Sequence, residues 1–125
     1  MSISGDKPNG QSITLSAPKF SISYSRYTNV TTHQGVHYEP SEDKLYLSFS
    51  GGTSGAYSLS VIRVFNSVSS SNGTKSEDDV CLFMKNGYFE IEGVGFQNTG
   101  STHRLIFNTM EGDLVNGCVY KDLTI

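Results

Sequence analysis

The sequence predicts an all-β protein, a two-sheet antiparallel β-sandwich of the jelly-roll kind, with a closed β-barrel as the alternative. The first observation is the alternation of bulky and small polar residues, clearest in Lys19-Phe20-Ser21-Ile22-Ser23-Tyr24-Ser25. Because successive side chains of a strand point to opposite faces, this pattern buries one face and exposes the other. The second observation is that turn residues separate such runs at short intervals. The third is that no long window shows apolar residues at helical spacing.

The alternating runs define the expected elements. We expect strands near residues 12–16, 19–27, 44–50, 56–66, 79–84, 87–92, 103–109 and 117–125, with shorter pieces around 36–39 and 93–97. The glycine-rich run 50–55 predicts a flexible turn, and Asn86-Gly87 is typical of a tight hairpin. Residues 1–11 are expected to form a disordered lead. Residues 12–125 are expected to form one domain with a single core, since a chain of this size buries roughly two-thirds of its unfolded surface.

The amino-acid composition indicates where the protein acts and argues against some classes of partner. Charged residues make up 17% of the chain, and their replacement by Ser, Thr, Gly and Asn is typical of extracellular and virion-surface proteins. The net charge of −3 and the scattered basic residues argue against nucleic acid, because duplex binding uses clustered Lys and Arg. No segment approaches the roughly 20 apolar residues of a membrane span, and the first residues lack the apolar run of a signal peptide. We therefore expect an extracellular or virion-surface location without membrane insertion.

Two cysteines, Cys81 and Cys118, each fall in a strand-like run. They either form a disulfide between strands or remain buried thiols that pack as small hydrophobes. The spacing matches no cysteine or histidine metal motif.

Two connections are longer than ordinary turns. Residues 66–79 are almost devoid of apolar side chains, which predicts a mobile surface loop. Residues 28–43 carry aromatic and hydrogen-bonding side chains with little periodicity, and long loops of this kind tend to be functional. The second loop is therefore the expected binding region.

The order of several runs resembles that of jelly-roll carbohydrate-binding modules, which are appended to glycoside hydrolases and to phage tail and baseplate proteins. The runs are 45–49, 57–64, 87–92, 103–107 and 117–125, and the last contains Tyr120-Lys121-Asp122 followed by alternating apolar residues. In these modules a strand of the form tyrosine, any residue, aspartate closes the fold. The resemblance implies a non-catalytic sugar-binding domain. It also implies a structural calcium ion held by the aspartate of the closing strand, here Asp122.

The candidate binding residues lie on and around the second loop. Sugar recognition needs aromatic faces for the apolar side of the ring and polar groups for the hydroxyls. That mixture is supplied by Arg26, Tyr27, His33, Gln34, His37, Tyr38 and Glu39. The alternative is that Tyr27 and Tyr38 are ordinary residues at the edge of the sandwich.

Other polar groups admit both a functional and a plain interpretation. His33 and His37 are four residues apart, as in helical zinc motifs, but no helix is indicated and surface histidines are the simpler explanation. Glu77-Asp78-Asp79 either ligates calcium or is a solvated loop end. Glu90 and Glu92 share one strand face with Tyr88, a spacing equally expected of an exposed face, so catalysis by paired carboxylates has little support. Apart from calcium, no cofactor is expected.

Two hypotheses for function follow from the sequence. The first is a non-catalytic carbohydrate-binding or adhesion module that recognises glycans by aromatic stacking and hydrogen bonds. The alternative is a trimeric structural or receptor-binding knob of a phage or viral fibre, in which the tyrosines and Phe96 line a subunit interface. The expected partner in both cases is a glycan or cell-surface polysaccharide.

Overall fold

The computed structural model describes residues 18–24, 27–70, 73–98, 103–111 and 114–123, the last range by its backbone alone. This part of the chain is built from β-strands. They are β1 (Phe20–Ser23), β2 (Thr32–Glu39), β3 (Lys44–Ser54), β4 (Tyr57–Phe65), β5 (Gly73–Ser76), β6 (Asp79–Asn86), β7 (Phe89–Asn98), β8 (His103–Glu111) and β9 (Leu114–Leu123).

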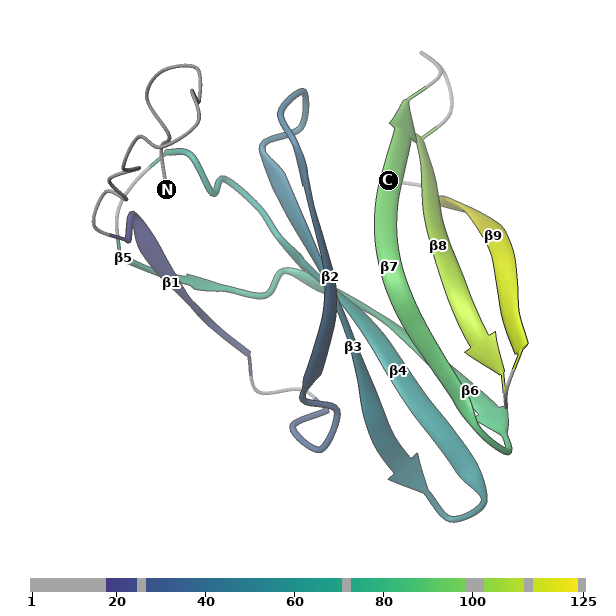
Figure 1. Cartoon of the computed structure of the whole chain (residues 1–125). Helices are drawn as coiled ribbons and strands as arrows, with labels where there is room; N and C mark the ends of the chain where they lie inside the picture. The colour runs from purple at the N-terminus through teal and green to yellow at the C-terminus, as the bar shows by residue number, and fades with distance from the viewer. Residues whose placement is uncertain (1–17, 25–26, 71–72, 99–102, 112–113, 124–125) are drawn as a thin grey trace, which may run out of the picture.

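The strands form three layers (Figure 1). The middle layer is an antiparallel sheet in the order β2-β3-β4-β6, and on one side it packs against an antiparallel sheet in the order β7-β8-β9. On the other side lies a short parallel pair, β1 with β5. The middle sheet is therefore covered on both faces, which explains why β4 is buried without a break from Leu59 to Phe65.

Each face of the middle sheet has its own hydrophobic cluster. We call the face toward β1 and β5 the groove face and the face toward β7, β8 and β9 the sandwich face. The groove face holds Val30, Leu47, Phe49, Leu59, Val61, Phe65 and Val68. The sandwich face holds Tyr46, Ile62, Val64, Phe89, Ile91, Leu105 and Phe107. The single core expected from the sequence is thus replaced by two, because the bulky residues of β3 and β4 alternate between the faces.

Hydrogen bonds as well as apolar contacts join the two large sheets. On the sandwich face the hydroxyl of Ser50 donates to the carbonyl oxygen of Ile91 at 3.1 Å, and the Ile91 N–H lies 3.0 Å from the same hydroxyl. The Ser60 hydroxyl lies 2.9 Å from that of Ser50. All three residues are fully buried. These hydroxyls form hydrogen bonds with backbone groups of β7 where β7 packs against the middle sheet.

The small residues where β2 meets β7 let the sheets approach closely. A Cβ atom at Gly35 would lie only 3.0 Å from the Cα of Gly93 and from the backbone nitrogen of Val94. That distance is too short for a side chain without movement of the backbone on one side. Glycine at position 35 therefore allows β2 and β7 to approach this closely.

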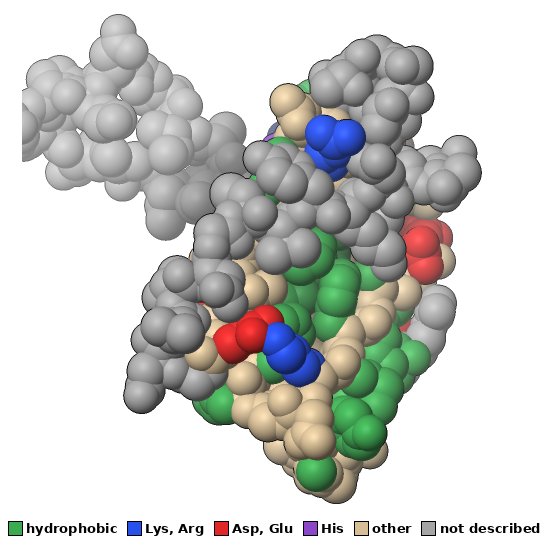
Figure 2. Space-filling view, turned by 90° about the vertical axis from the view of Figure 1, so that its right-hand side faces the viewer, with side chains coloured by type: hydrophobic (Ala, Val, Ile, Leu, Met, Phe, Trp, Pro, Cys, Tyr) green, Lys and Arg blue, Asp and Glu red, His purple; other side chains and the backbone are tan. Residues whose placement is uncertain are grey.

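The β-sandwich predicted from the sequence is confirmed, and no closed barrel forms among the described strands. The two antiparallel sheets follow the order of the chain, β2-β3-β4-β6 and β7-β8-β9, and β5 leaves this order to pair in parallel with β1. The surface seen from the side of β7, β8 and β9 carries hydrophobic and uncharged polar side chains with few charges between them (Figure 2). The described part contains no helix long and apolar enough to span a membrane.

Several expected elements are corrected by the structure. The predicted loop 28–43 contains β2, of which only a short piece around 36–39 was expected, and the predicted mobile loop 66–79 contains β5. The run 50–55 does not form the turn: β3 continues through a bulge between Phe49 and Gly52, and the turn comes at Gly55-Ala56. Asn86-Gly87 does not close a hairpin, since β6 and β7 belong to different sheets. The expected strand 12–16 and lead 1–11 lie outside the described residues.

Cys81 is present as a thiol, half-buried against the sandwich-face cluster. This environment fits the interpretation of a small hydrophobe. The side chain of Cys118 lies outside the described part of the structure.

Candidate functional site

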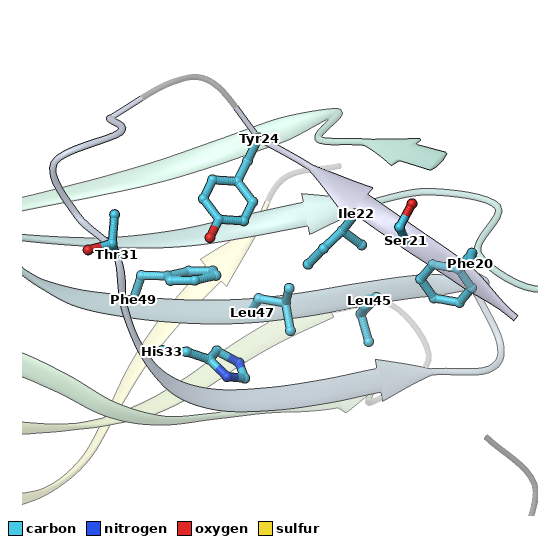
Figure 3. A pocket seen from close by; sticks show the side chains of 9 residues that line it. All are labelled: Phe20, Ser21, Ile22, Tyr24, Thr31, His33, Leu45, Leu47 and Phe49. Carbon is cyan, nitrogen blue, oxygen red and sulfur yellow. The ribbon is translucent and has the colours of Figure 1, made fainter. Parts of the chain in front are cut away.

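A groove of about 550 Å³ opens on the groove face, where β1 crosses β3 (Figure 3). Its floor is made by alternate residues of β3, which point to this face by strand periodicity. Its walls come from β1 and the segment after it on one side, and from the start of β2 on the other. The lining residues are Phe20, Ser21, Ile22, Tyr24, Thr31, His33, Leu45, Leu47 and Phe49. The volume lies in the range of about 300–1,000 Å³ that is usual for ligand sites.

A buried arginine lies beneath the aromatic end of the groove. Arg63 of β4 has no exposed surface, and its guanidinium lies 4.4 Å from the ring centre of Tyr24 and 4.9 Å from that of Phe49. Burial lowers the pKa of Arg63, and the nearby carboxylate of Glu77, 3.7 Å away, acts in the opposite direction. The cation is thus held by two ring faces and one carboxylate.

The same guanidinium fixes the turn that leads into β2. Its Nη2 donates to the carbonyl oxygens of Tyr27 at 3.0 Å and Val30 at 3.1 Å. Tyr27 has a φ of 54°, in the left-handed region, and its carbonyl also accepts from the Val30 N–H at 2.9 Å. Arg63 therefore holds in place both the rings of the groove wall and the turn beside them. Nothing in the strand pattern indicates this role, because Arg63 continues the alternation of β4.

The polar groups of the groove lie at its rim. Ser21, Thr31 and His33 are all exposed, while the apolar lining residues are partly or fully buried. The imidazole of His33 lies 5.2 Å from the ring of Phe49, and its Nε2 donates to the carbonyl oxygen of Gly35 at 3.1 Å. That bond places a proton on Nε2 and leaves Nδ1 as an acceptor. The groove thus combines an apolar floor with hydroxyl and imidazole groups at its edge.

The candidate cluster expected from the sequence is divided between the two faces of β2. His33 and Tyr38 pair with Phe49 and Leu45 and lie on the groove face. His37 and Glu39 lie on the sandwich face, where the ring of His37 is 6.3 Å from those of Tyr46 and Phe96. A strand separates neighbouring side chains in this way, whereas the expected loop would have allowed them to converge.

The remaining predicted residues make local contacts. Gln34, the extra residue of a bulge in β2, donates to the Glu90 carboxylate at 3.2 Å. Tyr27 and Tyr38 are 40% and 41% exposed, and Tyr38 donates to Asp43 at 3.0 Å, which raises the pKa of Tyr38. Only His33 lines the groove itself. Arg26 lies outside the described residues.

Phe96, expected at a subunit interface, is partly buried between the sheets within the described chain. Its ring stacks on that of Tyr46 at 5.4 Å and joins the sandwich-face cluster. The residues that the sequence did not single out are the aromatic walls of the groove, Phe20, Tyr24 and Phe49. Their alternation indicated burial, but periodicity carries no signal for the part of a buried face that remains uncovered.

The acidic residues considered for metal binding have other partners. Glu77 pairs with Arg63, Asp78 accepts from the backbone N–H of Asn66 at 2.7 Å, and Asp79 accepts from that of Val80 at 2.7 Å. Asp122 lies in β9 opposite Arg104, and its side chain lies outside the described part. Among the described residues, no three His, Cys, Asp or Glu side chains gather around a common point.

One carboxylate of β7, that of Glu90, contacts β2. Glu90 accepts from Gln34, and burial together with the negative charge of Glu90 raises the pKa of Glu92. Burial and the same two carboxylates raise the pKa of the neighbouring Tyr88. This group lies on β7, whereas the groove is lined from β1, β2 and β3.

Comparison of the chain with protein-family models, with curated proteins and with solved structures gives no match.

Proposed function

We propose that this protein is a non-catalytic carbohydrate-binding module whose ligand occupies the groove between β1, β2 and β3. The observation that carries the proposal is the composition of the groove, an aromatic and aliphatic floor with neutral polar groups at the rim. A pyranose ring has the complementary surface, with an apolar C–H face and a ring of hydroxyl groups. Pockets that combine apolar walls with a few placed polar groups are typical of small-ligand sites.

In this mechanism the C–H face of the sugar packs on Phe20 and Tyr24, the partly buried rings of the β1 side. Hydroxyls of the sugar bond to Ser21, Thr31 and the Nδ1 acceptor of His33, which the bond to Gly35 leaves available. Tyr38 and Val36, 41% and 58% exposed on the same face of β2, extend the surface beyond the groove. A longer glycan would therefore follow β2.

The chemistry of the lining favours binding over bond cleavage. Glycoside hydrolysis uses two carboxyl groups on either side of the scissile bond. The described lining residues supply rings, hydroxyls and an imidazole, and none of them is Asp or Glu. Binding by a few weak contacts is strengthened when several modules act on one polysaccharide.

The test is a titration of labelled protein with a panel of mono- and oligosaccharides, followed by backbone and histidine resonances. We expect shifts at Phe20, Tyr24 and His33. His33→Ala should weaken binding roughly tenfold, the equivalent of one lost hydrogen bond to a ligand. His37→Ala is the matched control, since it removes the same side chain from the same strand on the opposite face, and it should leave the affinity within about twofold.

The proposal is rejected if no saccharide in the panel shifts the groove resonances at millimolar concentration. Equal weakening by His33→Ala and His37→Ala would also reject it. That result would mean that the loss follows from damage to β2 and not from the groove.

A further inference from the structure

The two edges of the middle sheet differ in how they resist pairing with another strand. β2 at one edge carries a bulge between His33 and Gly35 and lies against β7. β6 at the other edge pairs with β4 over seven successive residues without a shift in register, and no described strand lies on its outer side. Natural edge strands are commonly protected by bulges, prolines or charges. The centre of β6, Val80-Cys81-Leu82-Phe83-Met84, has none of these.

From this geometry we propose that the outer edge of β6 is a docking surface for β6 of a second copy of this chain, paired antiparallel about a two-fold axis at Leu82. The two middle sheets would then join into one sheet of eight strands. Such an interface is isologous, so the same residues serve both partners.

The charges at the two ends of β6 select this register. With Leu82 opposite itself, Asp79 of each copy lies opposite Lys85 of the other. The pairs between them are Val80 with Met84 and Cys81 with Phe83, all apolar. Members of each pair share a face of the sheet, because directly opposed residues of antiparallel strands lie on the same side. A shift of the axis by one residue places Asp79 opposite Phe83 or Gly87 and loses both charge pairs.

The side chains at the ends of β6 are accessible for this pairing. Met84 is 54% exposed, Asp79 is exposed, and the side chain of Lys85 is 46% exposed. The ammonium of Lys85 already pairs with Glu111 of β8. It carries three N–H groups, so it can donate to a carboxylate of the second copy at the same time.

The first measurement is the mass of the native protein in solution by sedimentation equilibrium over about 1–200 µM, a range that brackets interfaces of modest size. We expect a reversible equilibrium between one and two chains. A single-chain mass throughout overturns the proposal, and that is also the result if another segment of the same chain covers this edge. A mass of three chains overturns it as well.

Two variants locate the interface. Met84→Lys places a charge opposite Val80 twice in each dimer and should raise the dissociation constant at least about tenfold. Val36→Lys is the matched control, because Val36 is 58% exposed on the same face of the opposite edge strand. It should change the constant less than about twofold. A larger effect of Val36→Lys than of Met84→Lys overturns the proposal.

The register is read by cross-linking in a Cys81→Ala, Cys118→Ala background that retains the native circular dichroism spectrum. Leu82→Cys should form a disulfide-linked dimer under mild oxidation, since the two cysteines face each other across the axis. Met84→Cys should not, because its copies are four residues out of register. Failure of Leu82→Cys to cross-link, or equal cross-linking of both variants, contradicts the register. Saccharide binding by the groove is a separate readout, so either proposal can fail alone.

Discussion

The two faces of the middle sheet are built from the same strands but are stabilised in different ways. The sandwich face is closed by a second sheet, with apolar rings and serine hydroxyls that satisfy the facing backbone. Among the described residues, the groove face is covered by the β1–β5 pair and adjoining turns, and it keeps a buried cation and an open groove. The continuous sheet β7-β8-β9 closes the sandwich face, whereas the short β1–β5 pair leaves part of the groove face accessible to a ligand. The difference separates the part of the molecule that maintains the fold from the part available to a ligand.

The largest expected effect tests the cation of the groove face. Arg63→Met removes the group that holds two carbonyls, two rings and Glu77 together, and leaves a buried carboxylate without this cation. We expect the free energy of unfolding to fall by about 3–5 kcal/mol, measured by urea denaturation. Resonances of Tyr24 and Tyr27 should move more than those of Leu105.

Arg63→Met together with Glu77→Leu is the informative companion variant. If the cost comes from the carboxylate left behind, the double variant should be more stable than Arg63→Met alone. A loss below about 1 kcal/mol for Arg63→Met, near the size of an ordinary neutral hydrogen bond, would show that the network contributes little.

A matched pair of leucines compares the packing of the two faces directly. Leu105 is fully buried on the sandwich face, and Leu47 is 5% exposed in the floor of the groove. Leucine to alanine in a core costs about 2–5 kcal/mol, and the cost rises with the volume of the closed cavity that remains. We expect Leu105→Ala near the upper end and Leu47→Ala near the lower end, since the space left by Leu47 joins an open groove.

Denaturant unfolding of both variants in parallel measures this difference. An equal loss would mean that the groove face is as tightly closed as the sandwich face. In that case the groove would need to open before it could accept a ligand.

Much of the fold could be predicted from the sequence, because a strand with one apolar and one polar face shows a regular alternation of apolar and polar residues. Residues 44–50, 56–66, 79–84 and 103–109 were placed within a few positions of β3, β4, β6 and β8. β2 was expected only as a short piece around 36–39, because the polar His37 and Glu39 on its sandwich face weaken the alternation. β5 was missed because Gly73–Ser76 has no apolar residue and owes its strand form to pairing with β1.

The candidate site was predicted less well than the fold, for a related reason. Because residues 28–43 were expected to form a loop, His33 and His37 were expected in one site. Both residues lie in β2, and their side chains are on opposite faces of the sheet. The groove residues were recognisable as apolar, but the described strand above them, β1, has four residues and leaves part of their surface uncovered. Coverage of one face by another element is a tertiary property, and alternation within a strand does not encode it.

The serine pair of the sandwich face provides a smaller test. Ser50→Ala removes the hydroxyl that bonds to both backbone groups of Ile91. We expect a loss of about 1–3 kcal/mol in the free energy of unfolding, because the buried C=O of Ile91 loses this donor while its N–H keeps the longer, 3.3 Å contact with the Ser60 hydroxyl. Amide hydrogen exchange should speed up at Ile91 in particular. The exposed Ser54→Ala at the end of β3 is the control and should have little effect.

The smallest expected effects concern pH and have opposite signs at two carboxylates near the seam of β2 and β7. The hydroxyl and backbone N–H of Ser41, with His37 nearby, lower the pKa of Glu39 below its ordinary value of 4.5. The folded protein therefore binds the proton of Glu39 less tightly than the unfolded chain does. The resulting stabilisation is present above pH 4.5 and is lost as the pH falls through the folded-state pKa of Glu39. Burial and the charge of Glu90 raise the pKa of Glu92 above 4.5, so ionisation of Glu92 costs stability as the pH rises through its folded-state pKa.

Glu39→Gln should consequently be less stable than the native protein at pH 7, and Glu92→Gln should be more stable. The difference for Glu39→Gln should shrink as the pH falls from 4.5 toward the folded-state pKa of Glu39. The difference for Glu92→Gln should shrink as the pH falls from the folded-state pKa of Glu92 toward 4.5. Thermal unfolding of the two variants between pH 3 and pH 8 measures this. If Glu92→Gln gives no gain at pH 7, the side chain of Glu92 is as well hydrated as in the unfolded chain. The surroundings of Glu92 on β7 would then be open to water, and the sealing of the sandwich face would not extend to this position.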